Sequence, residues 1–417
     1  MRSLNSPRHL RTRGRHSSMS LVFCVVLFLS TVEGRAAEER QDVLDVVTGG
    51  GIVYDSNLFK LPSSANPQAT LGRSTKSDTL TTAYVGLRVN KPYAQQLFQL
   101  DVTETIYRYH TFSHLDFEAF DYRGAWLWHL TPRLSGTLSA ERTKTLVPFE
   151  DYRLLSQQRN VRDNQNQTLL VDWWAFGGWH LLGGLANVEQ KSESPLLAEA
   201  DFSLVDRQAG VRYESAAGNS VAFVQHFRRG DYANKTADPV TFNDSGFNEN
   251  ESEFRWKWRI AGHSTFDGRA GWVSRNHENF PQRDYSGLVG ELGYGWTPTG
   301  KLRVYFNAKR NIDALVDPFA SYRINSSFSV LPAWHVTAKT TLSMRLERTE
   351  SDFRGPVVAP VGPVRSDTLH SLRLMADWKP TRNIALGAGV QRSERSSNLP
   401  DSGFDASIVY VRGGFRF

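Results

Sequence analysis

The feature that most constrains this chain is the strict alternation of apolar and polar residues within segments of about ten residues. The alternation recurs along the sequence, for example over 83–89, 254–260, 288–296 and 302–308. A period of two is that of a β-strand whose two faces meet different surroundings. Beyond residue 37, no stretch of about 18 residues is apolar enough to form a spanning helix. The sequence therefore predicts an all-β protein.

The connections between these segments predict the kind of sheet. Short turn signals, such as 90–94, 129–133 and 297–300, alternate with longer polar segments, such as 146–165 and 229–250. This layout is typical of outer-membrane barrels, which have brief turns at one end, long loops at the other and an even number of strands. We therefore predict a transmembrane antiparallel up-and-down β-barrel of about 18 strands, with about 16 as the alternative count.

The N-terminal segment 1–36 has the order of a secretory signal peptide. Several arginines are followed by the apolar run 21–29 and then by the small residues Gly34 and Ala36. The apolar run is shorter than the roughly 20 residues that span a bilayer, which makes a membrane anchor the weaker alternative. We predict a signal peptide over 1–36 and a single barrel domain over 37–417.

The charge and the cysteine content exclude several classes of function. Most of the formal net charge of +6 comes from the arginines of the predicted leader, so the remainder is nearly neutral. A nearly neutral chain offers no broad basic surface for nucleic acid. The single cysteine, Cys24, also lies in the leader, so the remainder has neither a disulfide framework nor a thiolate site.

Aromatic residues mark the predicted ends of strands. Trp128, Trp296 and Trp378 each end an apolar strand face immediately before a turn that contains proline. Tryptophan prefers the membrane interface, so these three residues predict a girdle at the short-turn end. Phe415 and Phe417 lie on one face of the last alternating segment. We expect this ending to be the signal that the outer-membrane assembly machinery reads.

The sequence contains no constellation that predicts catalysis. His370 beside Ser371, and His226 with Asp231, are the pairs that a Ser-His-acid hydrolase would need, but such neighbours are expected by chance in a chain of this length. No spacing typical of a metal or phosphate site stands out. The acidic, Asn-rich segment 238–253 is interpreted as a solvated external loop. We predict no catalytic, cofactor-binding or metal site.

The polar phase of the strands is more informative, because in a barrel it faces the lumen. The predicted lumen cations are Arg88, Arg212, Arg255, Lys257, Arg259, Arg269, Lys301, Arg303, Arg323, Arg345, Arg373, Arg412 and Arg416. The acids on the same phase are fewer: Asp101, Glu141, Glu214, Asp267, Glu291, Glu347 and Asp377.

Two interpretations of these charges stay open. An excess of fixed positive charge in a hydrated pore concentrates anionic solutes, such as polyanions or acidic sugars. Alternatively, the arginines pair with carboxylates across the lumen and stiffen the wall. The tyrosines Tyr84, Tyr107, Tyr109 and Tyr305 also lie in alternating segments and offer stacking faces for sugar rings.

Several stretches resemble one known family. They are 54–59 (YDSNLF), 122–134, 172–182, 280–286, 295–298 and the ending 397–417. On these residues the chain resembles EpsL, the exosortase-B-associated outer-membrane protein of exopolysaccharide biosynthesis operons in Gram-negative bacteria. The similarity runs from about Gly49 to the end. It implies a role in the export or assembly of an extracellular polysaccharide, with inner-membrane polysaccharide export proteins as possible partners, and it transfers no catalytic residue.

Together these observations predict a protein of the Gram-negative outer membrane. The leading hypothesis is a passive pore that takes part in polysaccharide export and contacts the polymer, the outer-membrane lipids and the assembly machinery. The main alternative is a general or anion-biased porin for small solutes. A less favoured alternative is an outer-membrane hydrolase, and the last is a structural anchor for polymer that does not conduct.

Overall fold

The computed structural model describes residues 43–149, 158–194, 201–240, 242–260, 262–317, 320–355 and 363–417. The predicted signal peptide, 1–36, lies outside the described residues. Within them the fold is almost entirely β-strand. The helical pieces are α1 (Pro67–Leu71) and the short 3-10 turns η1 (Ser113–Leu115) and η4 (Pro281–Arg283). No helix of the described residues has the length and apolarity that a membrane crossing needs.

Eighteen strands follow one another along the described part of the chain. The first nine are β1 (Leu44–Asp55), β2 (Asp78–Tyr93), β3 (Gln96–Tyr109), β4 (Phe117–Thr131), β5 (Leu134–Leu146), β6 (Val161–Phe176), β7 (Trp179–Ser192), β8 (Phe202–Glu214) and β9 (Ser220–Asp231). The second nine are β10 (Gly246–Ile260), β11 (Ser264–His277), β12 (Tyr285–Trp296), β13 (Leu302–Asp317), β14 (Ala320–His335), β15 (Thr340–Arg354), β16 (Ser366–Trp378), β17 (Ile384–Ser397) and β18 (Phe404–Arg416).

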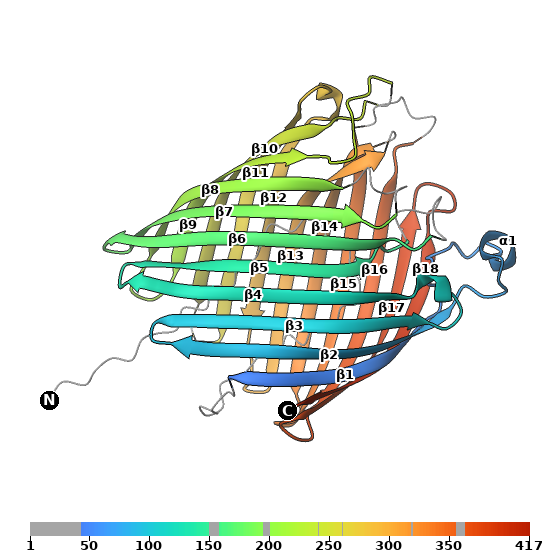
Figure 1. The fold of residues 1–417 in the computed structure, drawn as a ribbon, viewed down its shortest axis with the longest axis horizontal. Coiled ribbons are helices and arrows are strands. Elements are labelled where there is room, and N and C mark those ends of the chain that lie inside the picture. Colours follow the sequence, from blue (N-terminus) through green and yellow to red (C-terminus); the bar gives the residue numbers. More distant parts are fainter. Residues whose placement is uncertain are drawn as a thin grey trace.

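Every strand pairs antiparallel with its neighbours in sequence, and β1 pairs with β18 to close the sheet. The closing register places Gly49 opposite Gly414 and Tyr54 opposite Val409. In Figure 1 the strands of the near wall cross those of the far wall. This crossing is expected when strands tilt by about 35–45° from the axis of a barrel. The predicted fold, an antiparallel up-and-down barrel of about 18 strands, is confirmed.

The connections alternate in length as predicted, with one exception. At one end the turns are short, as between β2 and β3 or between β6 and β7, and at the other end longer segments join β1 to β2 and β9 to β10. The exception is the pair β13 and β14, where Asp317 pairs directly with Ala320 at the loop end. β1 begins and β18 ends on the short-turn side, because Leu44 pairs with Val89 near the β2–β3 turn.

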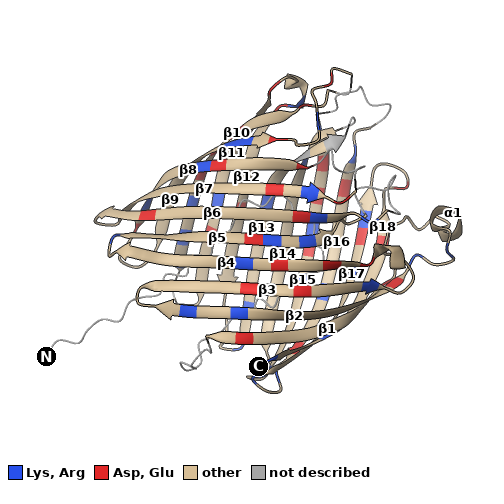
Figure 2. Ribbon diagram, viewed as in Figure 1, with Lys and Arg blue, Asp and Glu red and all other residues tan. Residues whose placement is uncertain are grey.

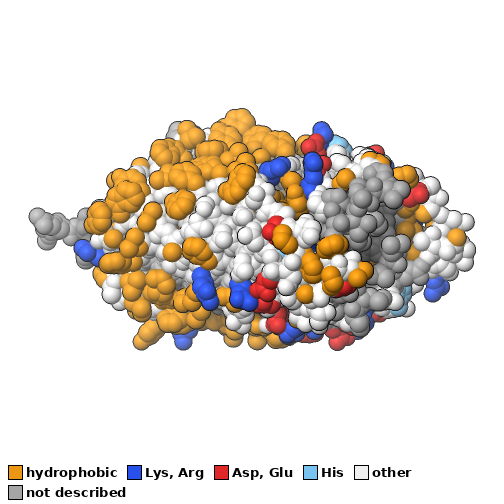
Figure 3. Space-filling view, turned by 90° about the horizontal axis from the view of Figure 1, so that it is seen from above, with side chains coloured by type: hydrophobic (Ala, Val, Ile, Leu, Met, Phe, Trp, Pro, Cys, Tyr) orange, Lys and Arg blue, Asp and Glu red, His pale blue; other side chains and the backbone are white. Residues whose placement is uncertain are grey.

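The outer surface carries an apolar belt. Large hydrophobic side chains that are exposed to the surroundings alternate along the strands, for example Val85 and Leu87 on β2 and Val409 and Val411 on β18. In Figure 3 such side chains cover mainly the left part of the surface, and charged side chains lie mainly toward the right. A closed antiparallel sheet pairs its backbone polar groups internally, so the uncovered apolar belt can face hydrocarbon.

The loop end of the barrel has a small hydrophobic core of its own. Phe59, in the segment between β1 and β2, is fully buried and packs against Phe112 and Phe149, with ring centroids 4.7 and 4.6 Å apart. Asn57 is also fully buried, and its amide donates hydrogen bonds to the carbonyl oxygens of Leu61 and Asp405. These contacts fix the β1–β2 segment over the end of the closing seam.

Asp244 joins two further loops at the same end. Its carboxylate accepts hydrogen bonds from the backbone N–H groups of Ser245, Asn279 and Phe280 and from the side-chain amide of Asn279. Burial alone raises the pKa of a carboxyl, but these hydrogen bonds outweigh it and hold the pKa of Asp244 below its usual value. The β9–β10 and β11–β12 connections are therefore tied together by one ionised group.

Candidate functional site: the charged inner wall

The phase of the exposed apolar residues identifies the inner face of each strand. Of the predicted lumen cations, Lys301 lies in the exposed turn between β12 and β13, so it is not part of a strand. The inward-facing set comprises Arg88, Arg212, Arg255, Lys257, Arg259, Arg269, Arg303, Arg323, Arg345, Arg373, Arg412 and Arg416. Figure 2 shows Lys, Arg, Asp and Glu spread over most strands of the barrel.

Many inward-facing arginines, among them also Arg123 on β4, pair with an inward carboxylate. The pairs are Arg88 with Asp101 (3.3 Å), Arg123 with Glu141 (3.0 Å), Arg212 with Asp172 (2.6 Å), Arg345 with Glu347 (2.8 Å) and Arg412 with Asp377 (2.6 Å). Arg373 donates a hydrogen bond to the side-chain oxygen of Gln391 (2.7 Å). Much of the predicted positive charge is therefore neutralised along the wall, which matches the second interpretation of the sequence for this part of the lumen.

Strand β10 carries the most ordered run of charge. Its inward face reads Phe247, Glu249, Glu251 and Glu253, followed by Arg255, Lys257 and Arg259 toward the short-turn end. The three glutamates are almost completely buried, whereas Lys257 and Arg259 are exposed. One strand face thus changes sign halfway along its length, and the two halves have different surroundings.

The acidic half belongs to a buried network. Arg228 on β9 binds Asp206 (3.3 Å), Glu249 (2.8 Å) and Glu251 (2.7 Å), and its side chain is only 4% exposed. Arg275 on β11 binds Glu249 from the other side (2.7 Å). Each buried charge has a partner of opposite sign, as burial requires.

Two further arginines complete this network. Arg269 on β11 binds Glu251 (3.0 Å) and Glu253 (2.7 Å), and Arg255 binds Glu253 as well. His226 on β9 contacts Asp206 (2.9 Å) and a guanidinium nitrogen of Arg255 (3.2 Å). Four arginines thus meet four carboxylates, so the network is neutral when His226 is neutral.

Aromatic rings cover part of the network. The guanidinium of Arg275 lies 3.7 Å from the ring centroid of Phe247 and 5.3 Å from that of Tyr285. Phe247, in turn, packs with Phe202 and Tyr232. These rings exclude water from the acidic end of β10, so the ion pairs there are stronger than exposed pairs would be.

The sequence interpretation of 238–253 as a solvated external loop is wrong for its second half. β10 begins at Gly246, and Glu249, Glu251 and Glu253 are inward, buried and paired. These acids were therefore also missing from the predicted lumen charges. The signal was present in the alternation of 247–259, which continues unbroken through the acidic residues.

The basic half of β10 is different from the rest of the wall. Among the described residues, Lys257, Arg259 and the nearby Arg303 on β13 form no ion pair with a carboxylate. The guanidinium of Arg259 lies near Gly218 in the β8–β9 turn. These three cations lie at the short-turn end of the β10–β13 wall, where the inward acid directly opposite Lys257 is Asp267, so cations outnumber acids there.

Tyrosines on the inner face lie flat against glycines of neighbouring strands. A Cβ atom added to Gly293 would be 2.0 Å from the hydroxyl oxygen of Tyr305, and one added to Gly49 would be 2.7 Å from that of Tyr84. Only glycine leaves room for these rings. The phenol rings therefore lie along the wall and not across the pore.

The residue pairs considered for a hydrolase do not converge. His370 and Ser371 are neighbours on β16, so their side chains point to opposite faces of the sheet. His226 contacts Asp206 and faces inward, whereas Asp231 is on the outward phase of β9 beside Arg229. In the described part of the chain, no cluster of three or more His, Cys, Asp or Glu residues could hold a metal ion.

The predicted girdle residues have different environments. Trp296 and Trp378 are 42% and 50% exposed at the short-turn end of the outer surface. Trp128 is on the same outer phase but only 7% exposed, because its ring lies over Gly136 of β5. At the C-terminus the rings of Phe415 and Phe417 are 4.5 Å apart, and Phe417 donates its backbone N–H to Val46.

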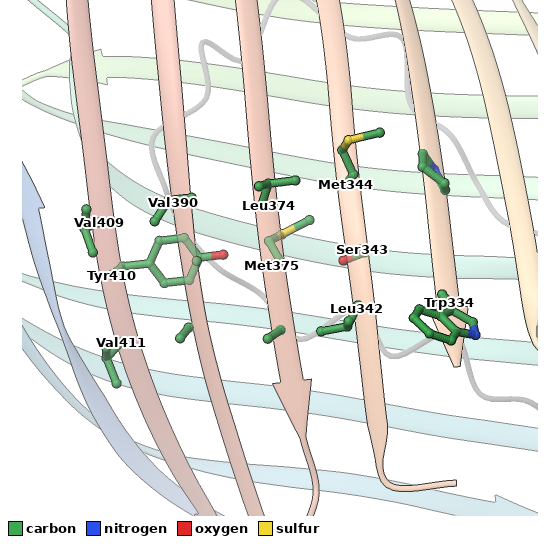
Figure 4. Close-up of a pocket in the computed structure, with 14 residues that line it drawn as sticks. Trp334, Leu342, Ser343, Met344, Leu374, Met375, Val390, Val409, Tyr410 and Val411 are labelled. Atoms are coloured by element: carbon green, nitrogen blue, oxygen red, sulfur yellow. The ribbon is translucent and has the colours of Figure 1, made fainter. Parts of the chain in front are cut away.

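An apolar groove lies on the outer surface. It has a volume of about 560 Å³ and is lined by residues of strands β14 to β18, among them Trp334, Leu342, Ala376, Ala388 and Val409. Figure 4 shows these strands side by side with the lining side chains between them. The groove faces hydrocarbon and offers almost no polar group, so the candidate site for solutes is the charged inner wall.

Comparison with known families gives one partial match. The family model "Putative beta-barrel porin 2" matches residues 264–416, which is β11 to β18 and less than half of the chain. No curated protein sequence matches at a significant level. The resemblance to EpsL is not reproduced by these comparisons and stays a prediction.

Solved structures share the architecture over nearly the whole chain. Pseudomonas aeruginosa OccK2 (OpdF) is 10% identical with a TM-score of 0.51, and the alignment covers 90% of this chain and 98% of that one. P. aeruginosa OpdK (10% identity, TM-score 0.50) and a BenF-like porin from Pseudomonas fluorescens Pf-5 (9%, 0.50) each cover 90% of this chain and 99% of theirs. At these identities the likeness concerns the fold alone.

The closed barrel, the lipid-facing apolar belt and the porin-like architecture establish where the chain resides. It is a porin-like β-barrel of the outer membrane of a Gram-negative bacterium, as the sequence predicted.

Proposed function

We propose that this barrel is a passive channel for small anionic solutes. The observation that carries the proposal is the row of cations at the short-turn end of the β10–β13 wall, Lys257, Arg259 and Arg303, which have no carboxylate partner among the described residues. Elsewhere on the inner wall most arginines are neutralised by an adjacent acid. The unbalanced charge is therefore local and positive.

The arrangement acts through electrostatics. Side chains two residues apart on one strand face are about 6.7 Å apart, so Lys257 and Arg259 offer successive positions for one anion. A low-dielectric wall focuses the field of such charges into the lumen, which raises the local concentration of anions and lowers that of cations. A passive barrel needs no cofactor or catalytic group for this function.

Two further points bear on the choice of solute. The solved structure of P. aeruginosa OccK2, a fold relative, was determined in complex with glucuronate, which makes a sugar acid a sensible first probe for this chain. The polysaccharide-export role implied by the EpsL resemblance stays a prediction, because the matches concern porins.

The test is ion selectivity of the refolded barrel in planar bilayers. We expect the reversal potential in a KCl gradient to indicate a preference for chloride. The combined substitutions Lys257→Glu, Arg259→Glu and Arg303→Glu should reverse this preference, because they convert the unbalanced charge from positive to negative without touching the buried network.

Arg229→Glu is the matched control, since Arg229 is an exposed arginine of the outward phase and should leave selectivity unchanged. A wild-type channel that prefers potassium, or a triple variant with unchanged selectivity, would refute the proposal. A barrel that folds but does not conduct would refute it too and would favour the structural anchor.

A further inference from the structure

Two small side chains make a hollow in the lipid-facing surface. Ala376 on β16 and Ala388 on β17 pair in the register of the sheet, and both are exposed on the outward phase. Larger outward side chains border this pair within its own register row, in the next row toward the loop end and in the next row toward the short-turn end (Figure 4). They are Leu342 and Val411, Leu374 and Val390, and Trp378 and Leu386, respectively. The apolar groove of about 560 Å³ lies over these two alanines.

Two lysines lie at the short-turn end of the same strands. Lys379 follows Trp378 directly, and Lys339 lies in the neighbouring β14–β15 turn. The ammonium of Lys339 donates a hydrogen bond to the carbonyl oxygen of Pro380 (2.6 Å), and the backbone N–H of Lys379 donates one to the carbonyl oxygen of Lys339 (2.8 Å). Lys379 is about 10 Å of extended chain from Ala376. The hollow therefore ends beside two adjoining turns that each carry a cation.

The charge of these two lysines is not balanced nearby. The two turns, 335–340 and 378–384, contain no Asp or Glu, and in the described structure neither Lys339 nor Lys379 forms an ion pair with a carboxylate. The adjacent acid, Asp377, points inward and binds Arg412 (2.6 Å). Lys339 uses one of its three ammonium protons on Pro380, and Lys379 is exposed. A group that binds both lysines must therefore be negatively charged.

The position of the hollow in the membrane identifies its occupant. Short turns lie at the periplasmic end of outer-membrane barrels, and tryptophans mark the level of the lipid headgroups. Trp378, which is 50% exposed, lies between the hollow and Lys379. A lipid with a chain in the hollow therefore has its phosphate at the level of the lysines. A second copy of this chain fits less well, because a two-fold axis would bring the same lysines of both copies together.

We propose that the hollow, Lys339 and Lys379 form a binding site for one anionic phospholipid of the periplasmic leaflet. An acyl chain packs over Ala376 and Ala388, and the headgroup phosphate binds the two ammonium groups. A zwitterionic headgroup brings a positive charge of its own, so it gains less from the two cations. The inference concerns the lipid-facing surface and does not depend on the proposed channel.

The test is a lipid titration of the refolded barrel in detergent, followed by native mass spectrometry. Phosphatidylglycerol and phosphatidylcholine with identical chains are compared by the dissociation constant of the first bound lipid. We expect phosphatidylglycerol to bind the wild type about tenfold more tightly. Lys339→Gln combined with Lys379→Gln should remove this preference. Ala376→Leu combined with Ala388→Leu should weaken the binding of both lipids, because the added side chains fill the hollow.

Lys91→Gln combined with Arg133→Gln is the matched control. Both residues are exposed at the short-turn end, on β2 and in the β4–β5 turn, and neither lies on the strands that form the hollow. This variant loses the same charge and should keep the preference for phosphatidylglycerol. Equal binding of the two lipids by the wild type, an unchanged preference in the lysine variant or an equal loss in the control would overturn the inference. A dimer that forms in the wild type and is lost when the hollow is filled would also overturn it, because a second copy would then be the occupant.

Discussion

Replacing Arg228 by methionine should destabilise the barrel strongly. Its guanidinium binds Asp206, Glu249 and Glu251, and all four side chains are buried. A charge-assisted hydrogen bond contributes about 1.5–3 kcal/mol, but the simple sum is too large, because each acid keeps a second partner. The remaining cost is that of a buried acidic cluster with one cation too few, about 3–5 kcal/mol.

The assay is urea-induced unfolding in phospholipid vesicles, followed by tryptophan fluorescence. Arg229→Met is the matched control, because Arg229 is the next residue of β9, points outward and makes only exposed ion pairs, whose loss costs up to about 1 kcal/mol. If Arg228→Met does not fold, Arg228→Lys gives a smaller and measurable loss. A loss for Arg228→Met no larger than for Arg229→Met would refute the argument that the buried network stabilises this wall.

Three further predictions concern the loops, the inner wall and the outer surface. The pKa of Asp244 is held below the usual 3.8, so at neutral pH the ionised carboxylate stabilises the two loops that it joins. This stabilisation should be lost as the pH falls below 3.8, and the backbone amides of both loops should then exchange their hydrogens faster. Asp244→Asn should remove this pH dependence of the exchange rates. Gly293→Ala should push the ring of Tyr305 into the lumen, and single-channel conductance should fall. Brominated lipids should quench the fluorescence of Trp296 more than that of Trp128, because the indole of Trp128 is buried. The contribution of each tryptophan is the fluorescence that disappears when it is replaced by phenylalanine.

The barrel could be predicted from the sequence because its signals are local. Alternation within a strand and the length of each connection are both properties of a few consecutive residues, and together they gave the class of fold and the strand count. Errors occur where the local signal is ambiguous. Lys301 continues the alternation of β13, yet the strand begins at Leu302, since the preceding residues form the turn.

The candidate site was harder to predict, because its partners come from different strands. The acidic stretch before Phe254 has the composition of a loop, and only the pairing of Glu249 with Arg228 and Arg275 makes its burial possible. Likewise, nothing in the sequence near Tyr305 indicates that two glycines of β12 support its ring. Register between strands decides both features, and a single sequence does not contain it.

The buried network and the open cations are parts of one arrangement. If Glu249, Glu251 and Glu253 faced the lumen without partners, they would cancel the field of Lys257 and Arg259 on the same strand face. Their burial under Arg228 and Arg275 confines the negative charge to the wall, and the neutrality of the network removes its field at a distance. Substitutions in the network should therefore change stability, and substitutions in the open row should change selectivity. Arg228→Lys keeps the network neutral but weakens its hydrogen bonds, so it should lower stability and leave chloride selectivity unchanged. If it altered chloride selectivity as much as Lys257→Glu does, the two parts would not be separate.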